Sequence, residues 1–130
     1  MKRFFVLFVL LVIAATPDSS AQKKRGERAY EAFNAGEYYE AIDEFKDTYS
    51  KTKKADRESR AEFIFMIAEC YRHINDPKNA ETWYKLAVKS SFSRPEAQYW
   101  LASTLKKNGK YQQAIEEYKN YKQTAPSDAK

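Results

Sequence analysis

The stretch GKYQQAIEEY, at residues 109–118, decides how the rest of the chain is read, because it has two earlier counterparts. Residues 36–45 read GEYYEAIDEF, and residues 75–84 read NDPKNAETWY. Their shared alanines, at positions 41, 80 and 114, are separated by steps of 39 and 34 residues. Similarity at this period predicts a stacked repeat, in which each unit buries its apolar face against the next unit.

The composition favours helices over sheets. The chain has 130 residues, which is enough for one domain. It contains three glycines and four prolines, too few for the turns of a multi-stranded sheet, whereas tyrosine, alanine, lysine and glutamate are abundant. The net charge of +5 is mild for this size and does not by itself indicate a nucleic-acid partner.

The N-terminus has the features of a signal peptide. Lys2 and Arg3 form a basic start, and residues 4–15 form an unbroken apolar run. This run is shorter than the roughly 20 residues that a membrane-spanning helix needs. Small residues then lead to Ala21, after which a signal peptidase would cut. We therefore expect residues 1–21 to be removed during export, the alternative being an uncleaved membrane anchor.

The mature chain, residues 22–130, is expected to be one domain of three two-helix units. The units span about residues 22–55, 61–94 and 95–128. Within the helices, apolar residues recur at intervals of three and four, which gives each helix one buried face. Gly36 and Gly109 are expected to end the first helix of their units, since glycine adopts the left-handed conformation found at helix ends.

Several residues predict where helices start. Asp56 and Asp76 are good N-caps, and Pro77 suits the first helical position. The Asp-Pro pair therefore replaces the glycine turn of the other two units. Residues 93–96, Ser-Arg-Pro-Glu, predict a capping box with proline in the first turn. The polar, lysine-rich residues 50–60 are interpreted as a longer helix end followed by a loop.

The first helix of the middle unit is the most apolar of the mature chain, which predicts that it is buried on more than one side. It carries the single cysteine, Cys70, which cannot form an internal disulfide. We expect a buried structural thiol there, since a reactive thiol needs an exposed, basic setting.

The C-terminal unit leaves an apolar face without a partner. We expect Leu105, Ile115 and Tyr118 to present an uncovered surface to a further helix. Pro126 is expected to end the last helix, and the Ser-Asp pair at 127–128 suits the start of another. Either the array continues in a longer protein, or this flank docks against a partner.

The pattern resembles the tetratricopeptide repeat, a helix-turn-helix unit of 34 residues. The motif Gly-x-Tyr-x-x-Ala-Ile-x-x-aromatic occurs at residues 36–45 and 109–118. The small sites of the family are matched by alanines at positions 29, 68 and 102 of the first helices and at 41, 80 and 114 of the second helices. The departures are the Asp-Pro turn, the inserted loop, and Lys53 and Phe92 at the expected closing proline. The resemblance implies an all-α fold of six helices in a short right-handed solenoid.

A narrower resemblance is carried by residues 68–72, 75–76, 80–84, 105 and 109–111, together with the signal peptide. These segments are similar to the N-terminal repeats of exported multidomain proteins that continue into a β-propeller and a peptidoglycan-binding domain like that of outer membrane protein A. One branch of that group belongs to the type IX secretion apparatus. The resemblance implies a periplasmic adaptor near the outer membrane, and it carries peptidoglycan binding over to no residue of this chain.

The tetratricopeptide resemblance also implies where a partner protein would bind. In that family the first helix of each unit lines a concave groove, which here would present a mixed aromatic and basic wall. The implied groove residues are Tyr30, Phe33, Asn34, Phe65, Glu69, Arg72, His73, Tyr99, Ser103, Lys106 and Lys107. Aromatic rings offer contact area at low entropic cost, and basic side chains favour an acidic segment or a carboxylate. Packing between helices is the alternative role for each aromatic side chain.

Residues that catalysis and metal binding need are scarce. The chain has one histidine and one cysteine, no glycine-rich phosphate loop, and no metal-ligand spacing of Cys or His. We therefore expect no enzyme, no catalytic residue, no metal and no cofactor. The leading hypothesis is a periplasmic scaffold that binds proteins. The alternative is a binder of acidic cell-wall polymer or a peptidoglycan-associated module, because basic and aromatic residues occur together; export argues against nucleic acid.

Overall fold

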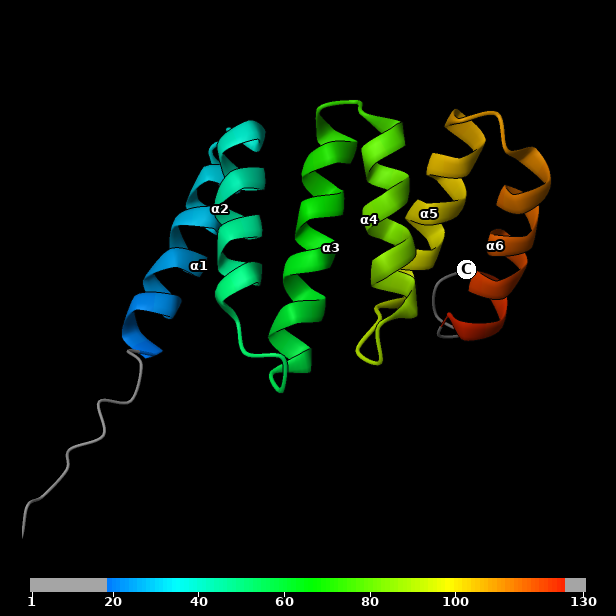
Figure 1. Ribbon diagram of the computed structural model, residues 1–130. Coiled ribbons are helices and arrows are strands. Elements are labelled where there is room, and N and C mark those ends of the chain that lie inside the picture. The colour runs from blue at the N-terminus through cyan, green and yellow to red at the C-terminus, as the bar shows by residue number, and fades with distance from the viewer. Residues whose placement is uncertain (1–18, 126–130) are drawn as a thin grey trace, which may run out of the picture.

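The computed structural model describes residues 19–125, which form a row of helices (Figure 1). They are α1 (Ser19–Asn34), α2 (Tyr38–Lys51), α3 (Arg57–His73), α4 (Pro77–Lys89), α5 (Pro95–Lys107) and α6 (Tyr111–Thr124). Each helix packs against the next one along the chain. Between residues 19 and 125 there is no strand. The all-α class and the arrangement in three helix pairs are therefore confirmed.

The three pairs turn in the same way. Gly36, Asn75 and Gly109 adopt positive φ angles of 79°, 56° and 75°. In each turn the N–H group of the following residue donates to the carbonyl oxygen five residues earlier, at 2.9 Å. These bonds satisfy the last carbonyl groups of α1, α3 and α5. Asn75 thus takes the place of glycine in the middle turn. The sequence predicted that Asp76 and Pro77 replace the glycine turn there.

Two of the three predicted helix starts are confirmed in full. The carboxylates of Asp56 and Asp76 each accept a bond of 3.1 Å from the backbone N–H group three residues later. The predicted capping box at Ser93 is wrong, because the N-cap of α5 is Arg94 and its side chain makes no capping bond. A residue before proline is held in an extended conformation, so the helix begins at Pro95 and Ser93 lies outside its first turn.

An arginine closes the longer connection between α2 and α3. The guanidinium of Arg60, in the first turn of α3, donates to the carbonyl oxygens of Tyr49 and Thr52, both at 3.0 Å. It also lies 4.0 Å from the centre of the Tyr49 ring. These carbonyl groups belong to the open C-terminal end of α2, so a side chain from the next helix satisfies them.

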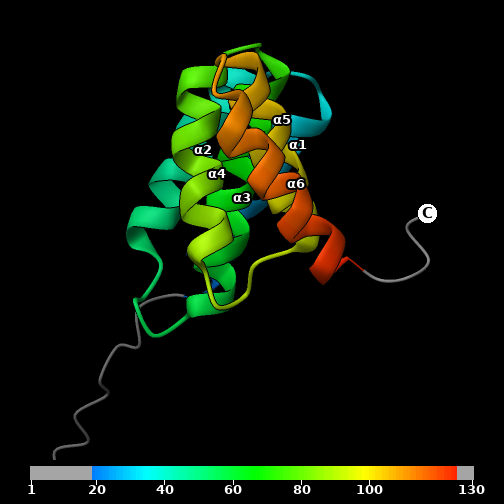
Figure 2. The same ribbon diagram turned by 90° about the vertical axis from the view of Figure 1, so that its right-hand side faces the viewer.

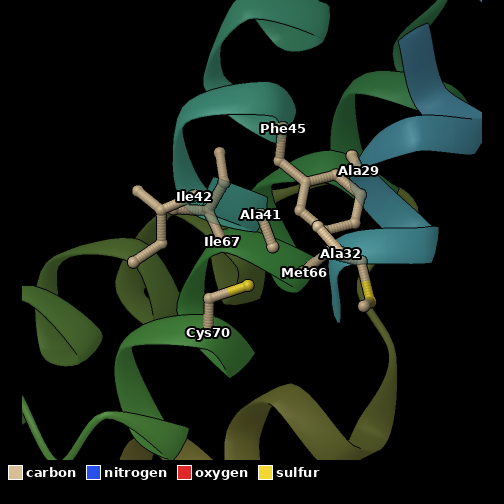
Figure 3. Close-up of a cluster of buried hydrophobic side chains, with 8 residues drawn as sticks. All are labelled: Ala29, Ala32, Ala41, Ile42, Phe45, Met66, Ile67 and Cys70. Atoms are coloured by element: carbon tan, nitrogen blue, oxygen red, sulfur yellow. The ribbon is translucent and has the colours of Figure 1, made fainter. Parts of the chain in front are cut away.

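The core consists of two clusters that share α3. One lies between α1, α2 and α3 (Figure 3) and contains Ala29, Ala32, Ala41, Ile42, Phe45, Met66, Ile67 and Cys70. The other lies among α3, α4, α5 and α6 and contains Ala68, Ala80, Tyr84, Leu101, Leu105 and Ala114. The prediction that this central helix is buried on more than one side is confirmed. Cys70 is fully buried, as expected.

The alanines of the repeat pattern are packing residues. All six, at positions 29, 41, 68, 80, 102 and 114, are buried. A small side chain lets the neighbouring helix approach closely, and a larger one at the same position would force the pair apart. The alanine spacing that marked the repeat in the sequence is therefore a spacing of buried residues between packed helices.

The C-terminal flank differs from the prediction at one of its three residues. Leu105 is only 1% exposed, because it packs into the second core cluster. Ile115 is 48% exposed and Tyr118 is half-buried, as an open flank requires. Figure 2 shows α6 nearest the viewer at this end of the row. The predicted helix end at Pro126 and the helix start at 127–128 lie outside the described residues.

The predicted signal peptide lies almost wholly outside the described residues. Only its last three residues are described, and they form the beginning of α1. The predicted cleavage position after Ala21 therefore falls within this helix. No helix in the described part of the chain is both long and apolar enough to cross a membrane.

Candidate functional site

A cleft of about 550 Å³ opens between α1, α3 and the start of α5. Its aromatic side chains come from α1, from α3 and from the loop that precedes α5. The residues that line it are Tyr30, Glu58, Ser59, Ala61, Glu62, Phe63, Phe65, Ala87, Phe92, Ser93, Arg94 and Ala97. The cleft thus combines elements of all three repeat units.

The hollow exists because small side chains stand behind it. Ala61, Ala87 and Ala97 line the cleft and are buried. Each presents one methyl group where a larger side chain would fill the space, since protein interiors otherwise pack with few voids. These alanines leave room for a bulky side chain from another molecule.

A shared carboxylate joins the walls of the cleft. The hydroxyl of Tyr30 donates to Oε1 of Glu62 at 2.8 Å, and the guanidinium of Arg94 donates to the other carboxylate oxygen. The same guanidinium lies 5.0 Å from the centre of the Phe65 ring. Burial, together with the bond to Glu62, raises the pKa of Tyr30, so its hydroxyl stays protonated and keeps donating. The network ties α1 and the start of α5 to α3, which makes the cleft preformed.

The mouth of the cleft carries an exposed aromatic ring. Phe92, in the loop between α4 and α5, is 49% exposed. Its neighbours at the rim include the exposed side chains of Glu58 and Ser93. Contact with an apolar group would remove this ring from water, which is favourable in proportion to the area covered. The arrangement suits a partner that inserts a bulky apolar side chain.

Two of the predicted groove residues line this cleft, namely Tyr30 and Phe65. The remaining nine lie elsewhere on the molecule, in three groups. These groups are not isolated from one another, since the guanidinium of Arg72 lies 3.3 Å from Nε2 of His73, and their role in partner binding stays a prediction.

The first group, Glu69 and Arg72, ties the middle unit to the last. The guanidinium of Arg72 donates twice to the carboxylate of Glu69, at 3.2 and 2.6 Å, and lies 4.0 Å from the centre of the Trp100 ring. The buried hydroxyl of Tyr84 donates to the same carboxylate. The two charges are thus paired with each other within α3, and a role for them in partner binding stays a prediction.

The second group lies near the turn between α1 and α2. The ring of His73 stacks on Tyr38 with centres 4.6 Å apart, and meets Phe33 edge-on at 5.5 Å. Burial and the nearby charge of Arg72 lower the pKa of His73, so its ring is neutral near pH 7. Asn34 is exposed at the end of α1. This group packs turns together and does not reach the cleft.

The third group lies along α5. The ring of Tyr99 packs against Trp100, Tyr118 and Tyr121, with centres 5.0, 5.7 and 5.5 Å apart. The other members are Ser103, Lys106 and Lys107, and the two lysines are exposed near the C-terminal end of the helix. The aromatic contacts hold α6 on α5, while the lysines remain open to solvent.

Sequence reasoning named only Tyr30 and Phe65 as binding residues among those that line the cleft, and those it missed include Glu62, Phe92 and Arg94. One signal was present, because Phe92 departs from the proline expected at that point of the repeat. An aromatic ring and an arginine in a short loop between units have no packing role in the repeat pattern. Such a departure, placed next to the first helix of the following unit, points to the cleft.

Possible metal ligands and the single thiol bear on catalysis within the described residues. Within residues 19–125, no three His, Cys, Asp or Glu side chains gather as metal ligands. Cys70 is buried, and burial together with the charge of Glu69 raises the pKa of its thiol to about 12. The thiol is therefore protonated at neutral pH. What the arrangement can do is hold an apolar side chain within a preformed aromatic cleft.

Comparison with known proteins supports the assignment of the repeats. Residues 73–130 match the model of the family described as anaphase-promoting complex, cyclosome, subunit 3. This family has repeats of the tetratricopeptide type, and the match spans the end of α3 together with α4, α5 and α6. The six helices are consistent with three repeats of that type. A search of curated proteins found no match to the chain.

Proposed function

We propose that this array of tetratricopeptide-like repeats is a non-catalytic scaffold, which binds a segment of a partner protein in the cleft between α1, α3 and α5. Repeats of this type imply protein partners. The observation that carries the proposal is the open cleft of about 550 Å³ with its four aromatic side chains. The partner segment inserts a bulky apolar side chain between Phe65 and the exposed ring of Phe92.

The cleft is preformed, which favours binding. A few aromatic anchors that become fully desolvated dominate the binding energy of most protein interfaces. Here the hydrogen bonds of Glu62 with Tyr30 and Arg94 already hold the walls in place, so little ordering is left for the binding step. In a preformed apolar cleft, a larger share of the contact energy therefore appears as binding affinity than in a cleft that must be ordered on binding.

We place the scaffold in the periplasm, in an outer-membrane-associated assembly such as the type IX secretion apparatus. The basic start and the apolar run of residues 1–21 support export, and the narrower sequence resemblance supports the assembly. N-terminal sequencing of the chain from fractionated cells tests this placement. We expect a periplasmic protein that begins at Gln22; a cytoplasmic protein that retains Met1 would contradict it.

Peptide selection tests the cleft. A random peptide library displayed on phage is selected on the folded chain, and the affinity of a recovered peptide is measured by fluorescence anisotropy. The variant Phe92→Ala removes an exposed ring at the mouth of the cleft, and we expect it to weaken binding about tenfold, the loss typical of an aromatic interface contact. The recovered peptides should share a bulky apolar residue.

Tyr39→Ala is the matched control. Tyr39 is 74% exposed on α2, so this variant also deletes an exposed aromatic ring, but outside the cleft. We expect its peptide affinity to equal that of the unmodified chain. Equal weakening by the two variants, or no effect of Phe92→Ala, would show that the selected peptides bind elsewhere and would contradict the proposal.

A further inference from the structure

We propose that the chain carries a second docking site, a basic pocket that binds an acidic segment of a partner protein. The pocket lies between the α2–α3 loop and the C-terminal end of α4, and has a volume of about 230 Å³. Lys54, Arg57 and Lys89 line it, together with the aliphatic side chains of Ile64 and Leu86. No acidic residue lines it.

The charges of this pocket are not neutralised by the protein. Among residues 19–125, no ion pair engages Lys54, Arg57 or Lys89. Arg57 donates only to the neutral hydroxyl of Ser91, at 2.5 Å. A fourth cation, Arg60, is bound to backbone carbonyl groups. The positive potential of the pocket is therefore available to an outside anion.

Other lysines on the same helices show the contrast. Lys51, at the end of α2, pairs with Asp47 one turn earlier. Lys85, on α4, pairs with Glu81 at 2.5 Å. Lys51 and Lys85 thus each have a carboxylate partner on their own helix, whereas the three cations of the pocket form no ion pair with any residue that the structure describes.

The pocket is separate from the aromatic cleft. The two share only Ala61, because they use different stripes of α3. Positions 57, 60 and 64 face the pocket, while positions 58, 62 and 65 face the cleft, as the helical period requires. Two partner segments can therefore occupy the molecule at the same time, which suits a scaffold.

The lining favours an acidic peptide over other polyanions. Leu86 is 44% exposed, so the pocket presents an aliphatic surface as well as its cations. A peptide with carboxylates around one aliphatic side chain satisfies both features at once. Single-stranded nucleic acid would instead need aromatic platforms for its bases, and no aromatic residue lines this pocket.

A binding assay with a defined probe tests the proposal. The probe is a short fluorescein-labelled peptide of glutamates around one leucine, and its affinity for the whole chain is measured by anisotropy at low salt. We expect binding that weakens as salt is added, since the cations are exposed. The double variant Lys54→Glu/Lys89→Glu should weaken binding at least about tenfold, because it replaces two attractions with two repulsions.

The double variant Lys106→Glu/Lys107→Glu is the matched control, since it changes the net charge equally at exposed positions on α5. It should weaken binding only slightly. Leu86→Ser should weaken binding without any change of charge, and circular dichroism should show that all variants remain folded. Phe92→Ala, which acts on the aromatic cleft, should leave this binding unchanged, so the two proposals can fail separately.

Several outcomes would overturn the proposal. Equal weakening by both double variants would reveal a general effect of net charge. If a peptide of lysines around leucine bound as tightly as the glutamate peptide, the cations of the pocket would not be responsible for binding. Tighter binding of a single-stranded oligonucleotide, an acidic cell-wall polymer or vesicles of phosphatidylglycerol through the same lysines would assign the pocket to another partner. Absence of glutamate-peptide binding at low salt would also contradict it.

Discussion

Glu81 is a buried acid that joins the last two repeat units. Its carboxylate accepts hydrogen bonds from Asn108 at 2.7 Å, from Lys110 at 2.7 Å and from Lys85 at 2.5 Å. Asn108 also donates to the carbonyl oxygen of Pro77, at 2.9 Å. One side chain of α4 thereby holds the whole turn between α5 and α6. Its charge state should therefore affect the stability of the array.

The first prediction concerns acid stability. Burial by itself would raise the pKa of Glu81, but the bonds from Lys110, Lys85 and Asn108 outweigh it and lower the pKa to about 2. A lowered folded-state pKa stabilises the fold above the ordinary value near 4.5 and loses that contribution as the pH falls towards 2. We expect a loss of about 2–3 kcal/mol in the free energy of unfolding over this window.

Urea unfolding followed by circular dichroism at a series of pH values measures this loss. Glu81→Gln cannot ionise, so its free energy of unfolding should depend less on pH between 4.5 and 2. Glu116→Gln, at an exposed position of α6, is the control and should behave like the unmodified chain. The same pH dependence for Glu81→Gln and the unmodified chain would refute this assignment.

The second prediction concerns the glycine turns. Gly109 has a φ of 75°, and a Cβ atom added there would meet no other atom within 4 Å. The cost of Gly109→Ala is therefore purely conformational, and we expect a loss of about 1 kcal/mol in the free energy of unfolding. Gly26→Ala is the contrasting variant, because Gly26 lies within α1 and its added methyl would only touch Phe63 at 3.8 Å.

Gly26→Ala should stabilise the chain by up to about 1 kcal/mol, since alanine favours the helix interior over glycine. Chemical unfolding of both variants compares the two effects directly. Opposite signs are the expected result. Destabilisation by both substitutions would mean that crowding, not backbone conformation, determines the cost.

At the scale of single elements, α2 depends on a side chain of α3 to satisfy the carbonyl groups at its C-terminal end. Arg60 satisfies two carbonyl groups of α2 and covers the ring of Tyr49. Arg60→Met keeps much of the aliphatic contact but removes the donors. We expect a loss of about 1–2 kcal/mol in the free energy of unfolding, in the range of charged hydrogen bonds at a partly exposed site.

Arg57→Met is the control for this third prediction, because Arg57 is exposed and donates only to Ser91. It should change the free energy of unfolding by less than about 0.5 kcal/mol. Hydrogen exchange of the last turn of α2 gives a second measurement, since that turn should exchange faster in Arg60→Met alone. Equal stability of the two variants would remove Arg60 as the cap.

The elements themselves could be read from the sequence where the signal is local. Glycines at positive φ, aspartates at N-caps and alanines at helix contacts act within a few residues, and each was predicted. The predicted capping box at Ser93 was wrong because Pro95 holds the preceding residue, Arg94, in an extended conformation. The prediction that Leu105 is uncovered was wrong because the side of a helix that faces its neighbour depends on the packing angle between the two helices. The spacing of apolar residues in the sequence does not determine that angle.

The candidate site was harder to predict than the fold, because its side chains are paired with residues far away in the sequence. The Glu62 bonds with Tyr30 and Arg94 each join residues 32 positions apart. Such pairings decide which side chains are already engaged and which surround an open cleft. The resemblance implied a binding role for Arg72, but the sequence did not reveal that its charge is paired with Glu69. A single sequence shows the residue types but not their partners.

At the scale of the whole molecule, the row of helices presents two openings on different stripes of its central helix. The aromatic cleft draws on all three repeat units, while the basic pocket uses α3, α4 and the loop before α3. Because α3 also contributes to both core clusters, the helix that the two clusters share positions both sites. The central claim is that the aromatic cleft holds a segment of a partner protein.

Site-specific photo-crosslinking in living cells tests that claim most directly. A photoreactive amino acid is placed at position 92 or, in the control, at position 39, and crosslinked products are identified by mass spectrometry. We predict that position 92 captures one defined segment that contains a bulky apolar residue, and that position 39 does not capture it. Capture of the same segment from both positions, or from position 39 alone, would contradict the account.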